Sequence, residues 1–164
     1  MAVSELPLSA ILANTPQWVF VVLAVLLVLG WRQSRDRRVR RGSLLILPVA
    51  MFGLSLHGVV ASFGFAPLPV LAWGLGNAMV LALRPAWLMP VVRAEPPGCL
   101  RVSGSWWPLT LMMAIFGIRY VIGYAAARQL PVVAQAWFAG SASLALGCLG
   151  GVFLARAVVA WRVR

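Results

Sequence analysis

Apolar residues fall into five long runs, and the links between them are rich in arginine, proline or glycine. The runs cover approximately residues 15–31, 44–64, 67–84, 106–127 and 132–155. An α-helix needs about 20 mainly apolar residues to cross the roughly 30 Å hydrocarbon core of a bilayer, and each run is near that length. The pattern therefore predicts an all-α integral membrane bundle of five transmembrane helices.

The composition agrees with lipid as the solvent. Of 164 residues, 62% are hydrophobic and only 10% are charged, which is too few charges to cover a soluble domain of this size. We expect residues 1–164 to form a single membrane domain.

The distribution of arginine predicts the orientation. The chain has fourteen basic residues, all of them arginine. Six lie between the first two runs, three more (Arg84, Arg93 and Arg101) lie between the third and fourth, and Arg156, Arg162 and Arg164 end the chain. Only Arg128 falls in a link on the opposite side. Because arginine concentrates in cytoplasmic loops, we predict an external N-terminus, a cytoplasmic C-terminus and a bacterial inner membrane.

A net charge of +11 would suggest nucleic acid for a soluble protein. Here the arginines flank apolar spans, where orientation and anionic headgroups explain them, so we expect no nucleic-acid partner. The arginines expected to contact anionic lipid on the cytoplasmic side are Arg32, Arg35, Arg37, Arg38, Arg40 and Arg41.

The cytoplasmic loop at 85–105 is the longest link. Two short stretches rich in Val and Leu flank Pro96-Pro97-Gly98, and Pro97-Gly98 suits the centre of a type II turn. A lone two-stranded ribbon is marginal in water, so a short hairpin and an irregular loop both stay open.

Polar residues inside the runs are costly in lipid and usually face protein, water or a ligand. If alternate helices cross in opposite directions, six of them fall at similar depth on the outer side of the midplane. These candidate ligand-binding residues are His57, Asn77, Arg119, Tyr120, Ser141 and Ser143.

The chemistry of this layer is unbalanced. The only acids of the chain, Glu5, Asp36 and Glu95, lie outside the runs, so Arg119 lacks a carboxylate partner within the membrane. Its guanidinium needs carbonyls, hydroxyls, water or a bound anion. One interpretation is a site for an anionic or carbonyl-bearing ligand. The other is an interfacial anchor, with the arginine stem extended toward the outer surface beside Tyr120.

Several reactions lack the residues that they need. A carboxylate proton relay or a carboxylate-bound metal requires an acid in a span. Ser141 or Ser143 could pair with His57, but no acid would orient the imidazole. His57 is the only histidine, so two-histidine ligation of a haem could arise only across a homodimer. We expect no cofactor and no metal.

Small residues recur at every fourth position of the last run. Ala139, Ser143, Gly147, Gly151 and Ala155 would align along one helix face and let another backbone approach closely. The partner would be a helix of the same chain or a second copy in a homodimer.

Four segments resemble a family of small bacterial inner-membrane proteins defined by a domain of unknown function. They are Thr15-Pro16-Gln17-Trp18-Val19-Phe20, Leu29-Gly30-Trp31-Arg32-Gln33-Ser34-Arg35, Gly104-Ser105-Trp106-Trp107-Pro108-Leu109 and Phe116-Gly117-Ile118-Arg119-Tyr120. The resemblance implies a multi-pass fold and carries no activity, substrate or cofactor.

Three functions are compatible with these features. The first is non-enzymatic binding or transport of a small anionic or carbonyl-bearing ligand at the polar layer. The second is an accessory or scaffold subunit that uses the small-residue face and the arginine-rich cytoplasmic loop to hold partner proteins or anionic lipids. The third is an enzyme that acts on lipid or quinone through His57 and Arg119, for which the residues give the least support.

Overall fold

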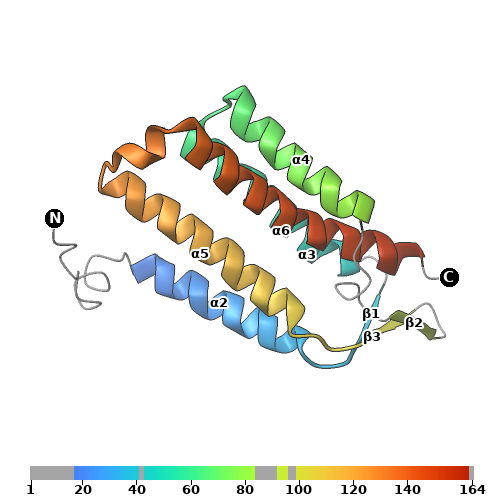
Figure 1. The fold of residues 1–164 in the computed structure, drawn as a ribbon. Coiled ribbons are helices and arrows are strands. Elements are labelled where there is room, and N and C mark those ends of the chain that lie inside the picture. The colour runs from blue at the N-terminus through green and yellow to red at the C-terminus, as the bar shows by residue number, and fades with distance from the viewer. Residues whose placement is uncertain (1–16, 41–42, 84–91, 96–98, 163–164) are drawn as a thin grey trace.

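The computed structural model describes residues 17–40, 43–83, 92–95 and 99–162. Its long helices are α2 (Gln17–Gln33), α3 (Ser43–Phe63), α4 (Pro67–Leu83), α5 (Trp107–Ala127) and α6 (Ala136–Arg162) (Figure 1). A 3₁₀ helix, η2 (Pro131–Ala134), precedes α6, and the short strands are β1 (Arg37–Arg40), β2 (Val92–Glu95) and β3 (Cys99–Val102).

Successive helices run in opposite directions and give the bundle two distinct ends (Figure 1). The sheet end holds the three strands and the last turn of α6. The turn end holds the α3–α4 turn, where Gly64 has a φ of +69°, and the link through η2. Gln129 at this end also has a positive φ and ends α5: its backbone N–H bonds to Ala126 O, and that of Leu130 bonds to Ala125 O.

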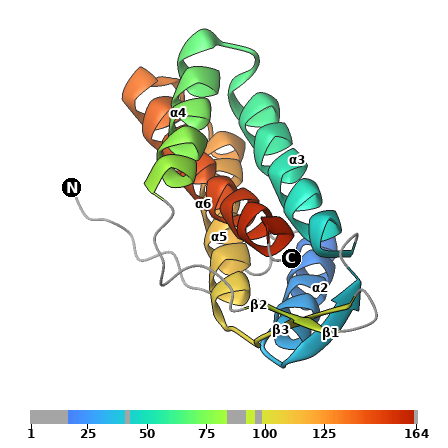
Figure 2. The same cartoon turned by 90° about the vertical axis from the view of Figure 1, so that its right-hand side faces the viewer.

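The helices form two groups (Figure 2). Helix α6 packs against α4 and α3, while α2 packs against α5. Gly30 is buried against the Leu109 side chain, so its lack of a Cβ lets α2 lie close to α5.

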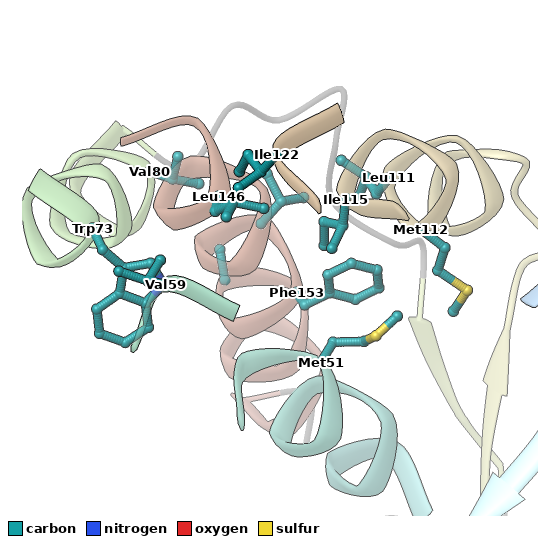
Figure 3. Packing of buried hydrophobic residues seen from close by; sticks show 12 residues of the cluster. Met51, Val59, Trp73, Val80, Leu111, Met112, Ile115, Ile122, Leu146 and Phe153 are labelled. Carbon is teal, nitrogen blue, oxygen red and sulfur yellow. The ribbon is translucent and has the colours of Figure 1, made fainter. Parts of the chain in front are cut away.

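Buried apolar side chains fill the space between the two groups. Met51 of α3, Met112 of α5 and Phe153 of α6 extend toward one another, and Leu146 is fully buried further along α6 (Figure 3). This core joins the α2–α5 pair to the other three helices.

The three strands form an antiparallel sheet in the order β1-β3-β2. The all-α expectation therefore describes the bundle, and the sheet is an addition to it. Strands β2 and β3 form a hairpin within 85–105, whereas Pro97-Gly98 lies outside the described residues. The arginine-rich link supplies β1, which was expected to be a loop.

The last helix differs from the predicted 132–155. Pro131–Ala134 is a separate 3₁₀ turn, and Gln135 is extended, with φ −82° and ψ 132°, so α6 begins at Ala136. It also continues to Arg162, because Arg156 and Arg162 do not interrupt a helix as proline or glycine would. The start of the first predicted helix, Thr15-Pro16, lies outside the described residues.

Two helical stretches, Trp107–Ala127 and Ala136–Val159, are long and apolar enough to cross a membrane. Three shorter apolar stretches, Val19–Gln33, Pro48–Phe63 and Pro67–Leu83, come from α2, α3 and α4. Large apolar side chains lie exposed on these helices, including Val28 at 60%, Ile46 at 70% and Leu71 at 71%.

Candidate functional site

Arg119 reaches from α5 to the backbone of α3. Its Nη1 donates a hydrogen bond of 3.0 Å to the carbonyl oxygen of Leu54. The guanidinium lies over Gly58, one turn further along α3, where a Cβ would fall 2.8 Å from Nη1 and 2.9 Å from Cζ. Because Gly58 has no side chain, the guanidinium can lie close to the backbone of α3 at this position. We call this position, formed by Leu54 O and Gly58, the guanidinium seat.

Among the described residues, most of the donor capacity of Arg119 is unused. A guanidinium carries five N–H donors, and the described residues provide one acceptor, the Leu54 carbonyl. No carboxylate contacts this half-buried side chain in the described part of the chain. The remaining N–H groups of the guanidinium can donate hydrogen bonds to oxygen atoms of a ligand or of water.

His57 and Tyr120 are sequence neighbours of this seat. His57 precedes Gly58, is exposed, and makes no hydrogen bond within the described ranges. The Tyr120 ring is half-buried and stacks on Phe116, with ring centroids 6.3 Å apart.

A second polar cluster lies buried where α3, α4 and α6 meet. Ser55 of α3 is fully buried, and its hydroxyl donates to Leu146 O at 2.9 Å. The Ser55 hydroxyl oxygen also accepts a hydrogen bond of 3.0 Å from Trp73 Nε1. Asn77, one turn after Trp73, donates from Nδ2 to Trp73 O at 3.0 Å, while its buried Oδ1 has no partner among the described residues.

The two candidate serines have different environments. Ser143 is fully buried in α6, and its hydroxyl has no partner among the residues that the structure describes. Ser141 is exposed and donates to Phe138 O of its own helix at 3.2 Å. The six predicted residues thus do not share one set of contacts: Arg119 contacts α3, whereas Asn77 and Ser143 are buried within the α3–α4–α6 group.

The small-residue face of α6 lies against α4 of the same chain at its central glycines. A Cβ on Gly147 would overlap the carbonyl oxygen of Trp73, and one on Gly151 would fall 3.0 Å from the Cα of Asn77. On the other side of the contact, a Cβ on Gly76 would meet Leu144 O at 2.5 Å. Ala139, Ser143 and Ala155 are buried on the same helix.

The predicted lipid-contacting arginines lie at the sheet end. Arg32, Arg35 and Arg38 are exposed, and Arg35 Cζ lies 6.0 Å from the centroid of the Trp31 ring. Arg37 and Arg40 are the first and last residues of β1, while Arg41 lies outside the described residues.

A carboxylate fixes this region. Asp36 Oδ1 accepts a 2.7 Å hydrogen bond from the backbone N–H of Gly104, and its Oδ2 lies 3.6 Å from Arg101 Nη2. The backbone N–H of Ser105 donates to Gln33 O at 3.0 Å. The segment between α2 and β1 is therefore bound to the segment between β3 and α5.

No group of three or more His, Cys, Asp or Glu side chains gathers within the described ranges. The site residues missed from the sequence are Ser55, Leu54 and Gly58. Ser55 carried a detectable signal, because it is a polar residue inside an apolar run. The carbonyl of Leu54 carried none, since every residue has one.

Comparisons with known proteins give a family and no activity. The model of a family of unknown function, DUF6622, matches residues 4–164. "Uncharacterized protein PM0739" of Pasteurella multocida (strain Pm70) is 38% identical over 63 residues, which cover 34% of this chain and 49% of that protein. The matched region thus spans about half the length of this curated relative. No solved structure matches the chain.

Proposed function

Since the chain belongs to DUF6622, a family of unknown function, we propose a function from its own geometry. The protein is a multi-pass membrane protein of the bacterial inner membrane that binds a small anionic or carbonyl-bearing ligand at Arg119. It has no catalytic role in this proposal.

Two observations support membrane insertion. The outer faces of the helices expose large apolar side chains such as Leu75 at 64% and Leu83 at 71%, which a water-soluble surface avoids in such number. The described arginines outside the helix interiors also separate by end, with Arg128 at the turn end and the others at the sheet end. This separation favours a cytoplasmic sheet end.

The hydrogen bonding of Arg119 is the observation that carries ligand binding. At 1.5 Å per residue, it lies about 12 Å from the turn end of α5 and about 18 Å from the sheet end. A charge at that depth is expensive in lipid unless its donors are satisfied. One backbone carbonyl satisfies one donor, so an anion or a carbonyl-bearing ligand that enters from the turn end would supply the rest.

Asn77 and Ser143 take a packing role in this proposal, because both are buried within the α3–α4–α6 group. The scaffold alternative has less support at one of its two surfaces, since Gly147 and Gly151 of the small-residue face already lie against α4. Its other surface, the arginine-rich loop, is unaffected by that contact. Ligand binding is therefore the function that the contacts favour.

Native mass spectrometry of the protein, gently extracted from its own membrane, tests the proposal. We expect a co-purifying small molecule on the wild type and its loss in Arg119→Gln, whose shorter amide retains a donor for Leu54 O but lacks the charge. Arg128→Gln is the matched control, because Arg128 is exposed and contacts Tyr124, with its Nε 3.3 Å from the tyrosine hydroxyl. Equal ligand occupancy in wild type and Arg119→Gln would contradict the proposal.

Gly58→Ala supplies an independent variant that keeps the charge. The added methyl group would occupy the guanidinium seat and push Arg119 off the Leu54 carbonyl. Loss of the ligand with an unchanged melting temperature would indicate that the position of the guanidinium, and not only its charge, holds the ligand. Retention of the ligand in this variant would contradict the seat described here.

A further inference from the structure

The guanidinium of Arg119 keeps one edge for a planar acceptor. A Cβ on Gly58 would lie 2.8 Å from Nη1, 2.9 Å from Cζ and 3.1 Å from Nε, so Nη2 is the nitrogen furthest from that glycine. Nη1 bonds to Leu54 O, whereas Nε and Nη2 donate to no acceptor among the described residues. These two atoms carry a pair of parallel N–H donors, and such a fork matches the two oxygens of one carboxylate.

The guanidinium seat lies deep along both helices that form it. Arg119 is about 12 Å from the turn end of α5, and Leu54 is about 14 Å from the turn end of α3, at 1.5 Å per residue. In a membrane-inserted bundle, a charge at that depth is costly without a counter-ion. The acids that the structure describes, Asp36 and Glu95, both lie at the sheet end. The depth of Arg119 therefore favours an anionic ligand over a neutral carbonyl.

An apolar stripe on α3 leads from the seat toward the sheet end. Ile46, Ala50 and Leu54 continue, at four-residue spacing, the side of the helix on which Gly58 lies. All three are exposed, Ile46 at 70% and Leu54 at 51%. The stripe is about 12 Å long, because eight residues separate its ends. A surface of this kind offers contact to an alkyl chain and none to a small water-soluble anion.

We propose that the ligand at Arg119 is a long-chain carboxylate, such as a fatty acid anion, dissolved in the leaflet at the turn end. Its carboxylate accepts hydrogen bonds from Nε and Nη2 of Arg119. Its alkyl chain lies along Ile46, Ala50 and Leu54 toward the middle of the bilayer. The inference rests on the proposed function and deepens it by naming the ligand class: the carboxylate supplies the counter-ion, and the bilayer delivers the ligand.

Binding of tritiated palmitate to the full chain in phosphatidylcholine nanodiscs, with empty nanodiscs as background, tests the ligand class. The competitors are hexadecanol, which has the chain without the carboxylate, and butyrate, which has the carboxylate with a short chain. We expect saturable binding of palmitate. Each competitor should need at least about a tenfold higher concentration than unlabelled palmitate, because hexadecanol lacks the charge-assisted hydrogen bonds and butyrate lacks most of the apolar contact.

Two substitutions at Arg119 separate the charge from the fork. Arg119→Gln should lower the affinity for palmitate at least about tenfold, as expected for lost charge-assisted hydrogen bonds. Arg119→Lys should give an intermediate affinity, since lysine keeps the charge but has no planar fork. Arg128→Gln is the matched control and should bind as the wild type does. Equal palmitate affinity in wild type and Arg119→Gln would overturn the inference.

The wild type alone also tests the inference, even if the Arg119 variants fail to fold. Competition by hexadecanol as strong as that by palmitate would overturn recognition of the carboxylate. Palmitate with a photoreactive diazirine in the middle of its chain should label a peptide that contains residues 46–54. Labelling confined to other helices would overturn the position of the chain.

The inference and the proposed function fail separately. A co-purifying quinone or small water-soluble anion that Arg119→Gln loses would support binding at Arg119 and overturn the long-chain carboxylate. Retention of the co-purifying ligand in Arg119→Gln would contradict both.

Discussion

At the scale of single residues, the Ser55 hydroxyl joins three helices. It donates to the backbone of α6 and accepts from the indole of α4, and it is fully buried. A buried donor or acceptor that loses its partner costs more than the net value of the hydrogen bond, because no water replaces the partner. Ser55 therefore matters more for stability than its size suggests.

We expect Ser55→Ala to lower the free energy of unfolding by about 1–2 kcal/mol, since it leaves Trp73 Nε1 and Leu146 O without this partner. Unfolding in mixed micelles, followed by circular dichroism, measures the change. Ser141→Ala is the matched control and should have little effect, because the Ser141 hydroxyl is exposed and, among the described residues, bonds only to Phe138 O in its own helix turn. Equal stability of the two variants would contradict a structural role for Ser55.

The sequence isolated Arg119 as an unpartnered charge, but it did not reveal what the guanidinium contacts. The acceptor is the backbone carbonyl of Leu54, and the guanidinium fits because Gly58 has no side chain. Neither contact can be recognised from the type of residue in the sequence. Ser55 was missed for another reason. It is a polar residue inside an apolar run, but its role as a bridge between neighbouring helices is recognised only when its hydrogen-bond partners are known.

At the scale of elements, α4 and α6 pack through glycines on both helices. Gly76 lies against the backbone of α6, and Gly147 lies against the backbone of α4. Such contact brings the two backbones within van der Waals distance over several turns and replaces the larger side chains that usually separate helices. A single added methyl group must then move a whole helix.

We expect Gly147→Ala to lower the melting temperature markedly, with a loss of about 2 kcal/mol or more, because the new Cβ would overlap the Trp73 carbonyl. Gly140→Ala on the same helix is the control. Its Cβ would lie 3.9 Å from Leu68 Cδ2, an ordinary contact, and alanine favours helix by about 0.5–1 kcal/mol over glycine. The prediction is wrong if Gly147→Ala melts at or above the temperature of Gly140→Ala.

The apolar runs predicted the bounds of α3, α4 and α5 within one residue, because run length and hydrophobicity act locally, whereas the last run starts four residues before α6 and stops seven residues short of its end. The sheet could not be predicted in the same way. β1 is Arg-Arg-Val-Arg, which lacks the pattern of a strand, and it pairs with residues near position 100 that lie beyond two intervening helices. Pairing over such a distance depends on where α2 and α5 place their ends, and therefore on tertiary structure.

At the scale of the whole molecule, the arginine distribution and the alternating helix directions agree on a two-ended bundle. The sheet end carries most of the described arginines, and the turn end carries Arg128. If the bundle crosses a membrane in this orientation, the two ends experience different compartments, and the Arg119 seat lies nearer the external one.

Alkaline phosphatase fusions test this orientation, because the enzyme is active only outside the cytoplasm. Fusions after Phe65 and after Gln129 should be active, whereas a fusion after Ser105 should be inactive. A fluorescent protein that folds only in the cytoplasm should give the reverse pattern at the same three positions. Activity of the Ser105 phosphatase fusion would contradict a cytoplasmic sheet end.

The contact between α4 and α6 also has a consequence for synthesis on the ribosome. Helix α4 is complete about 50 residues before the start of α6, and its glycine face does not meet α6 until α6 has been synthesised. If the chain is inserted into a membrane as it is made, Asn77 and the backbone near Gly76 face lipid or an insertion factor during that interval. Ribosomes that stall between α4 and α6 should therefore leave a chain that membrane quality-control proteases recognise.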